Sequence, residues 1–158
     1  MEERFQKYLT RNKNINRGYR KLEVWKDAID FYVFVAKKIR SLKEVPFKVK
    51  SQGEDSAYSV HSNISEGYCR RFIKENIQHN NTALASLGEN YSQMFALLNN
   101  GDIDEDWFQK YDKIHYALEN KMIRYIQSLI QQLNKETDWR TDYQVREIIE
   151  KYKMNSKD

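Results

Sequence analysis

Four long segments of this chain repeat apolar residues at spacings of three and four, which is the pattern of one helix face. The first such stripe contains Leu22, Trp25, Ile29, Tyr32, Ala36 and Ile39. Only five Gly and one Pro occur in the chain, so few residues interrupt these helices. No segment shows the alternation of a half-buried strand. The sequence therefore predicts an all-α fold.

The other three stripes predict where the remaining helices lie. The second helix should run from about Val49 to Glu66, with Gly67 as a C-terminal stop, and its inner side carries Gly53, Ser56, Ala57, Val60 and Ile64. The third stripe is Ile73, Ile77, Asn80, Leu84, Leu87, Tyr91, Met94 and Leu98. The fourth is Trp107, Tyr111, Ile114, Leu118, Met122, Tyr125, Leu129 and Leu133. Pro46 separates the first two helices, and Asn99-Asn100-Gly101-Asp102 is the clearest turn.

Four amphipathic helices joined by short loops are typical of an antiparallel up-down four-helix bundle. The heptad spacing of the stripes predicts left-handed packing at about +20°. Thr141-Asp142-Tyr143-Gln144 resembles a capping box, so we expect a short extra C-terminal helix. The chain then divides into a basic N-terminal arm (1–21), the bundle (22–134) and a C-terminal extension (135–158).

The single cysteine and the apolar runs bear on the compartment. Cys69 has no second cysteine to pair with, which excludes an internal disulfide and fits a reducing environment. The longest apolar run, Phe31 to Ala36, is far too short to cross a bilayer, and the N-terminus lacks a signal-peptide pattern. We therefore expect a cytoplasmic protein that does not bind membranes.

Basic residues are concentrated in two regions, although the net charge is only +4. Residues 1–21 contain two acidic residues and seven basic ones, which are Arg4, Lys7, Arg11, Lys13, Arg17, Arg20 and Lys21. A second group surrounds the first predicted loop: Lys37, Lys38, Arg40, Lys43, Lys48 and Lys50. Such groups can bind phosphates electrostatically, which suggests a nucleic-acid partner. The alternative is that both groups only solvate the surface.

A line of polar residues lies within the second predicted helix. Its members recur at spacings of four and three: Gln52, Ser56, Ser59, Asn63 and Glu66. Ser86 and Glu89 of the third helix are candidate partners for them. Buried polar groups without hydrogen bonds cost about 1–3 kcal/mol each, so such a line needs a polar neighbour. We interpret it as a structural network that sets helix register or assembly, with a catalytic role as the lesser alternative.

These polar positions also form part of a longer motif. It comprises Gln52, Ser59, Asn63-Ile64, Glu66-Gly67, Ala83, Ser86-Leu87 and Glu89, preceded by Trp25 and Ala28. On these residues the chain resembles the four-helix-bundle proteins known as 23S rRNA intervening-sequence proteins, over residues 20 to 133. Two positions depart from the family pattern: Asp55 replaces an Arg, and His61 replaces a Pro that would kink the helix.

The resemblance implies an assembly more than an activity. A related protein, the accessory subunit of diversity-generating retroelements, is a barrel-shaped homopentamer that partners a reverse transcriptase and nucleic acid. By resemblance, we expect a ring-like homo-oligomer here, with five copies as the leading number.

Enzyme chemistry finds little support in the sequence. Di-metal bundles need Glu-x-x-His motifs, whereas this chain offers Glu75 with His79 and Asp112 with His115. His61 has no acidic orienter on its own helix face, which favours a surface or interface position. Cys69 lies beside Arg70 but lacks an evident base. We predict no catalytic residues, no metal and no cofactor.

The leading functional hypothesis is thus a non-enzymatic, homo-oligomeric helical bundle that binds RNA or another nucleic acid through its basic residues. The alternative is a protein-interaction scaffold or an accessory subunit of a nucleoprotein complex. The surplus of aromatic residues, with eleven Tyr and seven Phe, would supply its partner surfaces.

Overall fold

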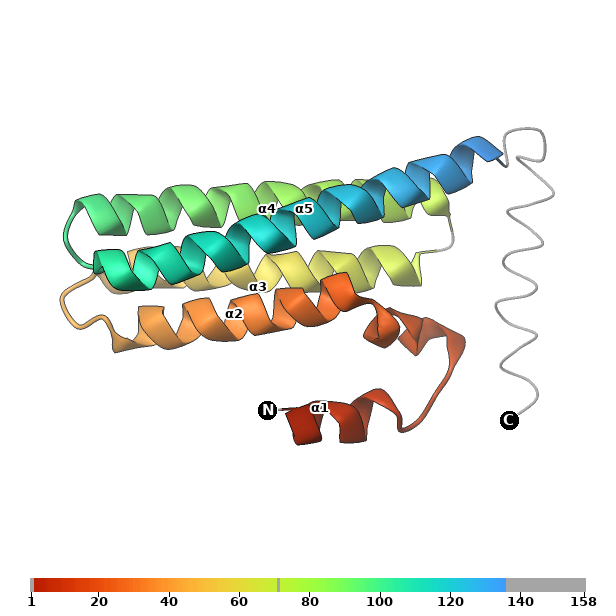
Figure 1. Cartoon of the computed structure of the whole chain (residues 1–158), viewed down its shortest axis with the longest axis horizontal. Helices are drawn as coiled ribbons and strands as arrows, with labels where there is room; N and C mark the ends of the chain where they lie inside the picture. Colours follow the sequence, from red (N-terminus) through yellow and green to blue (C-terminus); the bar gives the residue numbers. More distant parts are fainter. Residues whose placement is uncertain (1, 71, 136–158) are drawn as a thin grey trace.

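The computed structural model describes residues 2–70 and 72–135, with side chains from residue 6 onward (Figure 1). Over these residues the chain is helical and forms no strand, which confirms the all-α prediction. The elements are α1 (Glu2–Leu9), the 3-10 helix η1 (Ile15–Lys21), α2 (Glu23–Ser41), α3 (Phe47–Cys69), α4 (Ile73–Asn99) and α5 (Glu105–Lys135). The predicted C-terminal helix lies outside the described residues.

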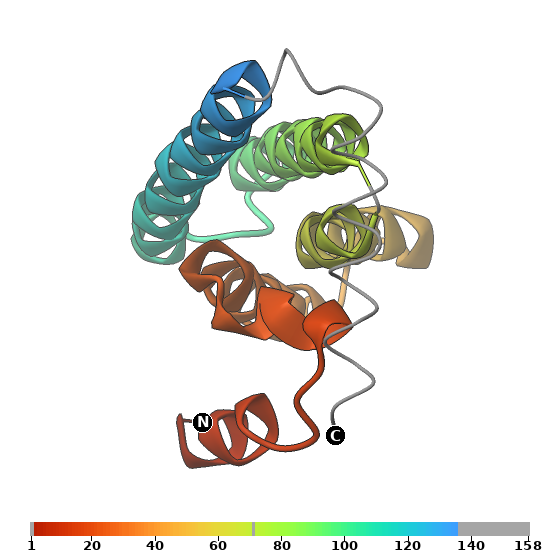
Figure 2. The same cartoon turned by 90° about the vertical axis from the view of Figure 1, so that its right-hand side faces the viewer.

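Helices α2 to α5 lie side by side along the long axis of the molecule, with successive connections at alternate ends (Figure 1). Each packs against the next along the chain, and α5 also contacts α2. Seen from one end, the four helices surround a common interior (Figure 2). Every helix therefore contributes one face to a shared core.

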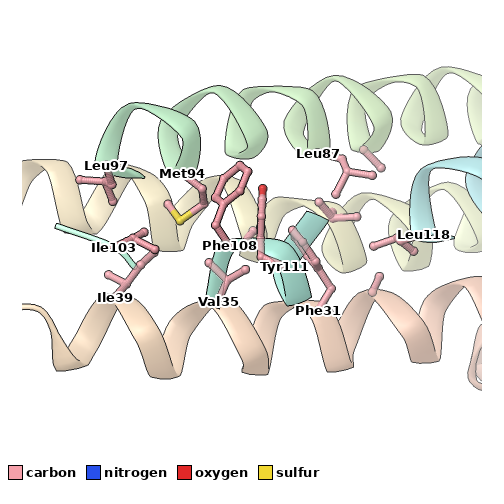
Figure 3. Packing of buried hydrophobic residues seen from close by; sticks show 14 of the residues in the cluster. Phe31, Val35, Ile39, Leu87, Met94, Leu97, Ile103, Phe108, Tyr111 and Leu118 are labelled. Atoms are coloured by element: carbon pink, nitrogen blue, oxygen red, sulfur yellow. The ribbon is translucent and has the colours of Figure 1, made fainter. Parts of the chain in front are cut away.

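Apolar side chains from all four helices fill this interior (Figure 3). Phe31 of α2, Leu87 and Met94 of α4, and Tyr111 and Leu118 of α5 are almost completely buried. Burial of one such side chain contributes about 1.5–3 kcal/mol, so this cluster supplies the main stabilisation of the fold. The rings of Phe31 and Tyr111 meet with their centroids 5.9 Å apart.

The turn before α5 has the geometry that its residues indicate. Gly101 adopts a φ of 81°, in the left-handed region that glycine enters without steric cost. Asp104 then caps α5, because its Oδ1 accepts a hydrogen bond from the backbone N–H of Trp107 at 2.8 Å. The chain reverses here within a few residues and brings α5 against α4.

The second predicted helix is longer at both ends than expected. It begins at Phe47, directly after Pro46, and continues to Cys69. The prediction that Gly67 stops it was wrong, since Gly67 is buried within the last turns of α3. Its role is close packing, because a Cβ at this position would lie 2.9 Å from the Cβ of His79 on α4.

The buried faces of α4 and α5 are also shifted from the predicted stripes. On α4, Ala83, Asn90 and Leu97 are buried, whereas their neighbours Leu84, Tyr91 and Leu98 are only partly covered. On α5, Ile114 is exposed and His115 is buried. Adjacent residues point about 100° apart on a helix. The rotation of the helix about its axis, relative to its two packing partners, therefore decides which of two adjacent residues is buried. A set of apolar spacings alone does not specify that rotation.

The segment before α2 packs against the body of the protein. η1 contacts α2 and α3, and the ring of Tyr19 meets those of Trp25 and Tyr68 at centroid distances of 5.1 and 6.3 Å. The Arg20 guanidinium donates hydrogen bonds to the backbone carbonyls of Tyr8, Arg11 and Asn12. Residues 15–21 are thus part of the packed structure.

Across the described ranges, none of the helices has both the length and the apolar character required to cross a membrane.

The close approach at Gly67 can be tested with two glycine substitutions. Gly67→Ala should lower the free energy of unfolding by about 1–3 kcal/mol, because the new Cβ meets Asn76 and His79 at less than contact distance. Gly88→Ala is the matched control: nothing lies within 4 Å of its Cβ position, so it should stabilise α4 by up to about 1 kcal/mol. Urea denaturation measures both. Equal effects would contradict the packing role of Gly67.

Candidate functional site

A line of hydrogen-bonded side chains joins α3 to α4, and we call it the polar seam. It comprises Ser56, Ser59, Asn63 and Glu66 of α3 with His79, Ser86, Asn90 and Gln93 of α4. The four α3 residues recur at spacings of three and four, so they share one side of that helix. The polar line of α3 therefore faces the neighbouring helix.

Asn90 is the buried centre of the polar seam. Its Nδ2 donates to the Gly53 carbonyl at 2.8 Å and to Ser56 Oγ at 2.9 Å. Its Oδ1 accepts from the Tyr111 hydroxyl at 3.0 Å, which ties α5 to the same point. Burial raises the pKa of Tyr111, so this hydroxyl keeps its proton and remains a donor. Three helices are joined through one amide.

The middle of the seam is only partly buried. Ser59 Oγ lies 3.0 Å from Ser86 Oγ across the helix pair. Asn63 Nδ2 donates to the Ser59 carbonyl at 2.9 Å and to Ser59 Oγ at 3.0 Å. These bonds continue the network from the buried Asn90 toward the end of α3.

The outer end of the seam contains its charged groups. Arg70 pairs with the Glu66 carboxylate and donates from Nε to His79 Nε2 at 3.1 Å. A guanidinium can only donate, so His79 Nε2 is an acceptor and the ring proton is on Nδ1. That proton faces Asn63 Oδ1 at 3.3 Å. His79 is therefore held as an oriented ring between two helices.

The remaining polar residues of the sequence motif lie at the edge of this network. Gln52 is exposed on α3. Glu89 is also exposed and accepts from Gln93 Nε2 at 3.0 Å, while Gln93 Oε1 accepts from Ser56 Oγ at 2.7 Å. Sequence reasoning did not assign His79, Asn90 and Gln93 to the network. For Asn90 a signal existed, since Ala83, Leu87, Asn90 and Met94 share helical spacing.

Several basic residues proposed for nucleic-acid contact bind other parts of the chain. Lys38 Nζ lies 2.8 Å from Asp104 Oδ2 and over the ring of Trp107. Arg40 pairs with Glu54, and Lys50 donates to the Leu42 carbonyl at 3.0 Å. In the N-terminal segment, the guanidinium groups of Arg17 and Arg20 donate to backbone carbonyls. These side chains serve packing and loop geometry.

Other basic residues have exposed side chains, and they fall into separate areas: Lys7, Arg11, Lys13, Lys21, Lys37, Lys43 and Lys48. The side chain of Arg4 lies outside those described. α1 lies alongside α2, but η1 precedes α2 and the loop to α3 follows it, so Lys21 and the lysines of that loop lie at opposite ends of α2 (Figure 1). Nineteen residues of helix separate them by about 28 Å. We call residues 42–50 the α2–α3 corner.

Comparison with protein-family models matches residues 20–124 to the model described as 23S rRNA-intervening sequence protein. The chain belongs to this family. The match includes the polar seam and the α2–α3 corner, whereas residues before 20 fall outside it. A search of curated proteins found no match. The intervening-sequence family is thus defined here by the helical core and not by the N-terminal segment.

In this intervening-sequence protein, His61 is packed within an aromatic cluster. Its ring lies against those of Tyr32 and Tyr58, with centroid distances of 5.5 and 4.7 Å. Burial lowers the pKa of His61, which disfavours its charged form. His61 is thus half-buried on α3, and the predicted surface or interface position stays a prediction. Within residues 2–70 and 72–135, no group of three or more His, Cys, Asp and Glu could hold a metal ion.

A hollow of this intervening-sequence protein lies between α1, α2 and α5. It has a volume of about 860 Å³ and an apolar floor that includes Phe34 and Leu118. Its wall also carries the carboxyl groups of Glu23, Asp27 and Asp30. Burial, followed by the nearby Asp27, raises the pKa of Asp30. Lys26 and Lys37 also line the hollow and Asp27 pairs with Lys121, so both signs of charge are present there.

The buried centre of the polar seam can be tested through Tyr111. Tyr111→Phe should lower the free energy of unfolding by about 1–3 kcal/mol, because Asn90 Oδ1 is then left without its donor in a dry environment. Tyr116→Phe removes the same hydroxyl from an exposed α5 residue and should stay within about 0.5 kcal/mol of the wild type. Chemical denaturation of both variants makes the comparison. A similar stability for the two would rule out the proposed role of Asn90.

Proposed function

We propose that this intervening-sequence protein is a self-associating, non-enzymatic RNA-binding protein of the cytoplasm. Its four long helices would form an antiparallel, left-handed up-down bundle, which agrees with contacts between successive helices and between α5 and α2. The single cysteine supports the reducing compartment. RNA is proposed as the partner because exposed lysines and arginines can contact phosphates.

The α2–α3 corner carries this proposal. Lys43 and Lys48 are exposed, and neither forms an ion pair with another described residue. The corner itself is anchored, because Leu42 and Val45 are buried in the core. Cations held on a fixed loop can contact phosphates without first breaking intramolecular pairs. Arg40 lies nearby but is already paired with Glu54.

Neutralising the two free lysines tests this surface. Lys43→Gln combined with Lys48→Gln should weaken binding of a labelled RNA oligonucleotide. It should also reduce the slope of log K against log salt by about 0.7–0.9 for each phosphate that the protein no longer neutralises. The measurement is fluorescence anisotropy between about 50 and 200 mM salt.

A double variant elsewhere provides the control for that experiment. Lys74→Gln with Arg124→Gln removes the same charge from exposed residues of α4 and α5. It should leave the salt slope close to that of the wild type. Equal reductions in affinity for both double variants would show that only net charge matters and would exclude a corner site. Deleting residues 1–21 is a poorer test, since it also removes the packed ring of Tyr19.

Self-association is supported by the outer face of α5. Tyr116, Ile123 and Ile130 are exposed large apolar residues at intervals of seven, which is the repeat of helices that pack against other helices. We propose that this stripe contacts another copy of the chain. The family resemblance favours a ring of five copies.

Ile123→Glu should shift the protein toward monomers, because a carboxylate in an apolar contact loses its hydration without gaining a partner. Ser92→Glu adds the same charge to an exposed α4 residue and should leave the particle mass unchanged. Light scattering after gel filtration measures both masses. A wild type that is already monomeric at working concentration would refute self-association through α5.

A second candidate function is an accessory subunit that binds a protein partner. The aromatic cluster of Tyr32, Tyr58 and His61 favours it, because Tyr58 remains 53% exposed on the outer side of α3. Tyrosines in such positions often dominate protein interfaces. A defined partner that stays bound after nuclease treatment at high salt, and is released by Tyr58→Ala, would support this candidate over RNA binding.

A further inference from the structure

Phe47 is exposed at the α2–α3 corner to an unusual degree for a phenylalanine. Its exposed fraction is 82%, the highest among the large apolar residues in the described part of the chain. Burying such a ring would contribute about 1.5–3 kcal/mol, so its exposure leaves a substantial interaction unused. Single exposed apolar residues are common, so the exposure of Phe47 indicates a binding site only together with the residues around it.

The backbone around Phe47 is held in place. Pro46 precedes α3, and its carbonyl accepts from the N–H groups of Val49 and Lys50, which forms the first turn of the helix. Lys50 Nζ also donates to the Leu42 carbonyl and links the helix to the preceding loop. The ring of Phe47 is therefore attached to an ordered helix start rather than to a long loop.

Two exposed lysines flank Phe47 in the sequence. Lys48 is its neighbour in sequence, with a Cα about 3.8 Å away, and Lys43 lies at the other side of the short loop. Both lysines are exposed. Of the acidic residues nearby, Glu54 pairs with Arg40, Asp55 accepts from Ser51 Oγ at 3.2 Å, and Glu44 is exposed on the loop. An aromatic face and two available cations thus occupy one corner.

We infer that Phe47 stacks on an unpaired base while Lys43 and Lys48 contact the flanking phosphates. This inference rests on the proposed RNA binding and specifies its substrate as a single strand. In a duplex, each base is covered on both faces by its neighbours, so a protruding ring has no face to contact. A single strand offers free base faces, and stacking on an aromatic residue contributes about 1–3 kcal/mol per base.

The requirement for a ring can be separated from the requirement for apolar surface. Phe47→Leu keeps an apolar side chain but removes the aromatic face, whereas Phe47→Trp keeps that face. Phe47→Leu should weaken binding of a single-stranded RNA oligonucleotide by about five- to a hundredfold, with an unchanged salt slope because no charge is altered. Phe47→Trp should retain binding, and its indole fluorescence should be quenched when RNA is added.

Two controls accompany this experiment. Tyr8→Leu removes an aromatic ring that is 63% exposed on α1 and should leave RNA affinity unchanged. A duplex RNA of the same length should bind more weakly than the single strand, and its affinity should be the same for wild type and Phe47→Leu. Denaturation midpoints should agree among all variants, since both rings lie largely outside the core.

The possible outcomes are distinguishable. If the wild type binds neither RNA form, the proposed function itself fails. If the wild type binds single strands and Phe47→Leu binds them equally well, the stacking inference is wrong while RNA binding stands. If Phe47→Leu changes the particle mass in light scattering, Phe47 contacts another copy of the chain and the inference is overturned.

Discussion

The close contact between α3 and α4 is the interaction on which the rest of this structure depends. Gly53 and Gly67 have no side chains, which allows Ile39 of α2 and Met94 and His79 of α4 to approach α3 closely. Asn90 can then reach the Gly53 carbonyl and Ser56 together, and it also binds the Tyr111 hydroxyl of α5. Hydrogen bonds of this kind are strong in a dry interior and costly to leave incomplete. They select one register among the many that apolar packing alone would allow.

The position of the α2–α3 corner follows from that register. α3 is held on one side by the polar seam and on another by contacts with α2, including the pair of Arg40 with Glu54. Its first turn must then start where Pro46 leaves the loop, with Phe47 outside the core. The same contacts divide the cations into two classes. Those near acidic or carbonyl partners stabilise the fold, and those on the outer side of the corner remain available.

Much of the architecture was predictable from sequence because it depends on local rules. The helical spacing and the scarcity of Gly and Pro indicated an all-α chain, and Asn99 to Asp102 indicated the turn before α5. The polar motif pointed to the family that the comparison confirmed. The end of α3 was mispredicted, because a glycine can either stop a helix or admit a neighbouring helix. Sequence spacing does not distinguish these two uses.

The sequence by itself determined the class of fold, the places where helices lie and the regions where positive charge is concentrated. These follow from backbone preferences and from the period of the side chains. Only the tertiary structure decided that His79 and Asn90 complete the polar line of α3, that Arg20 and Arg40 are engaged, and that Phe47 is uncovered. Each of these depends on the rotation of one helix against another, and that rotation is set by packing between residues distant in sequence.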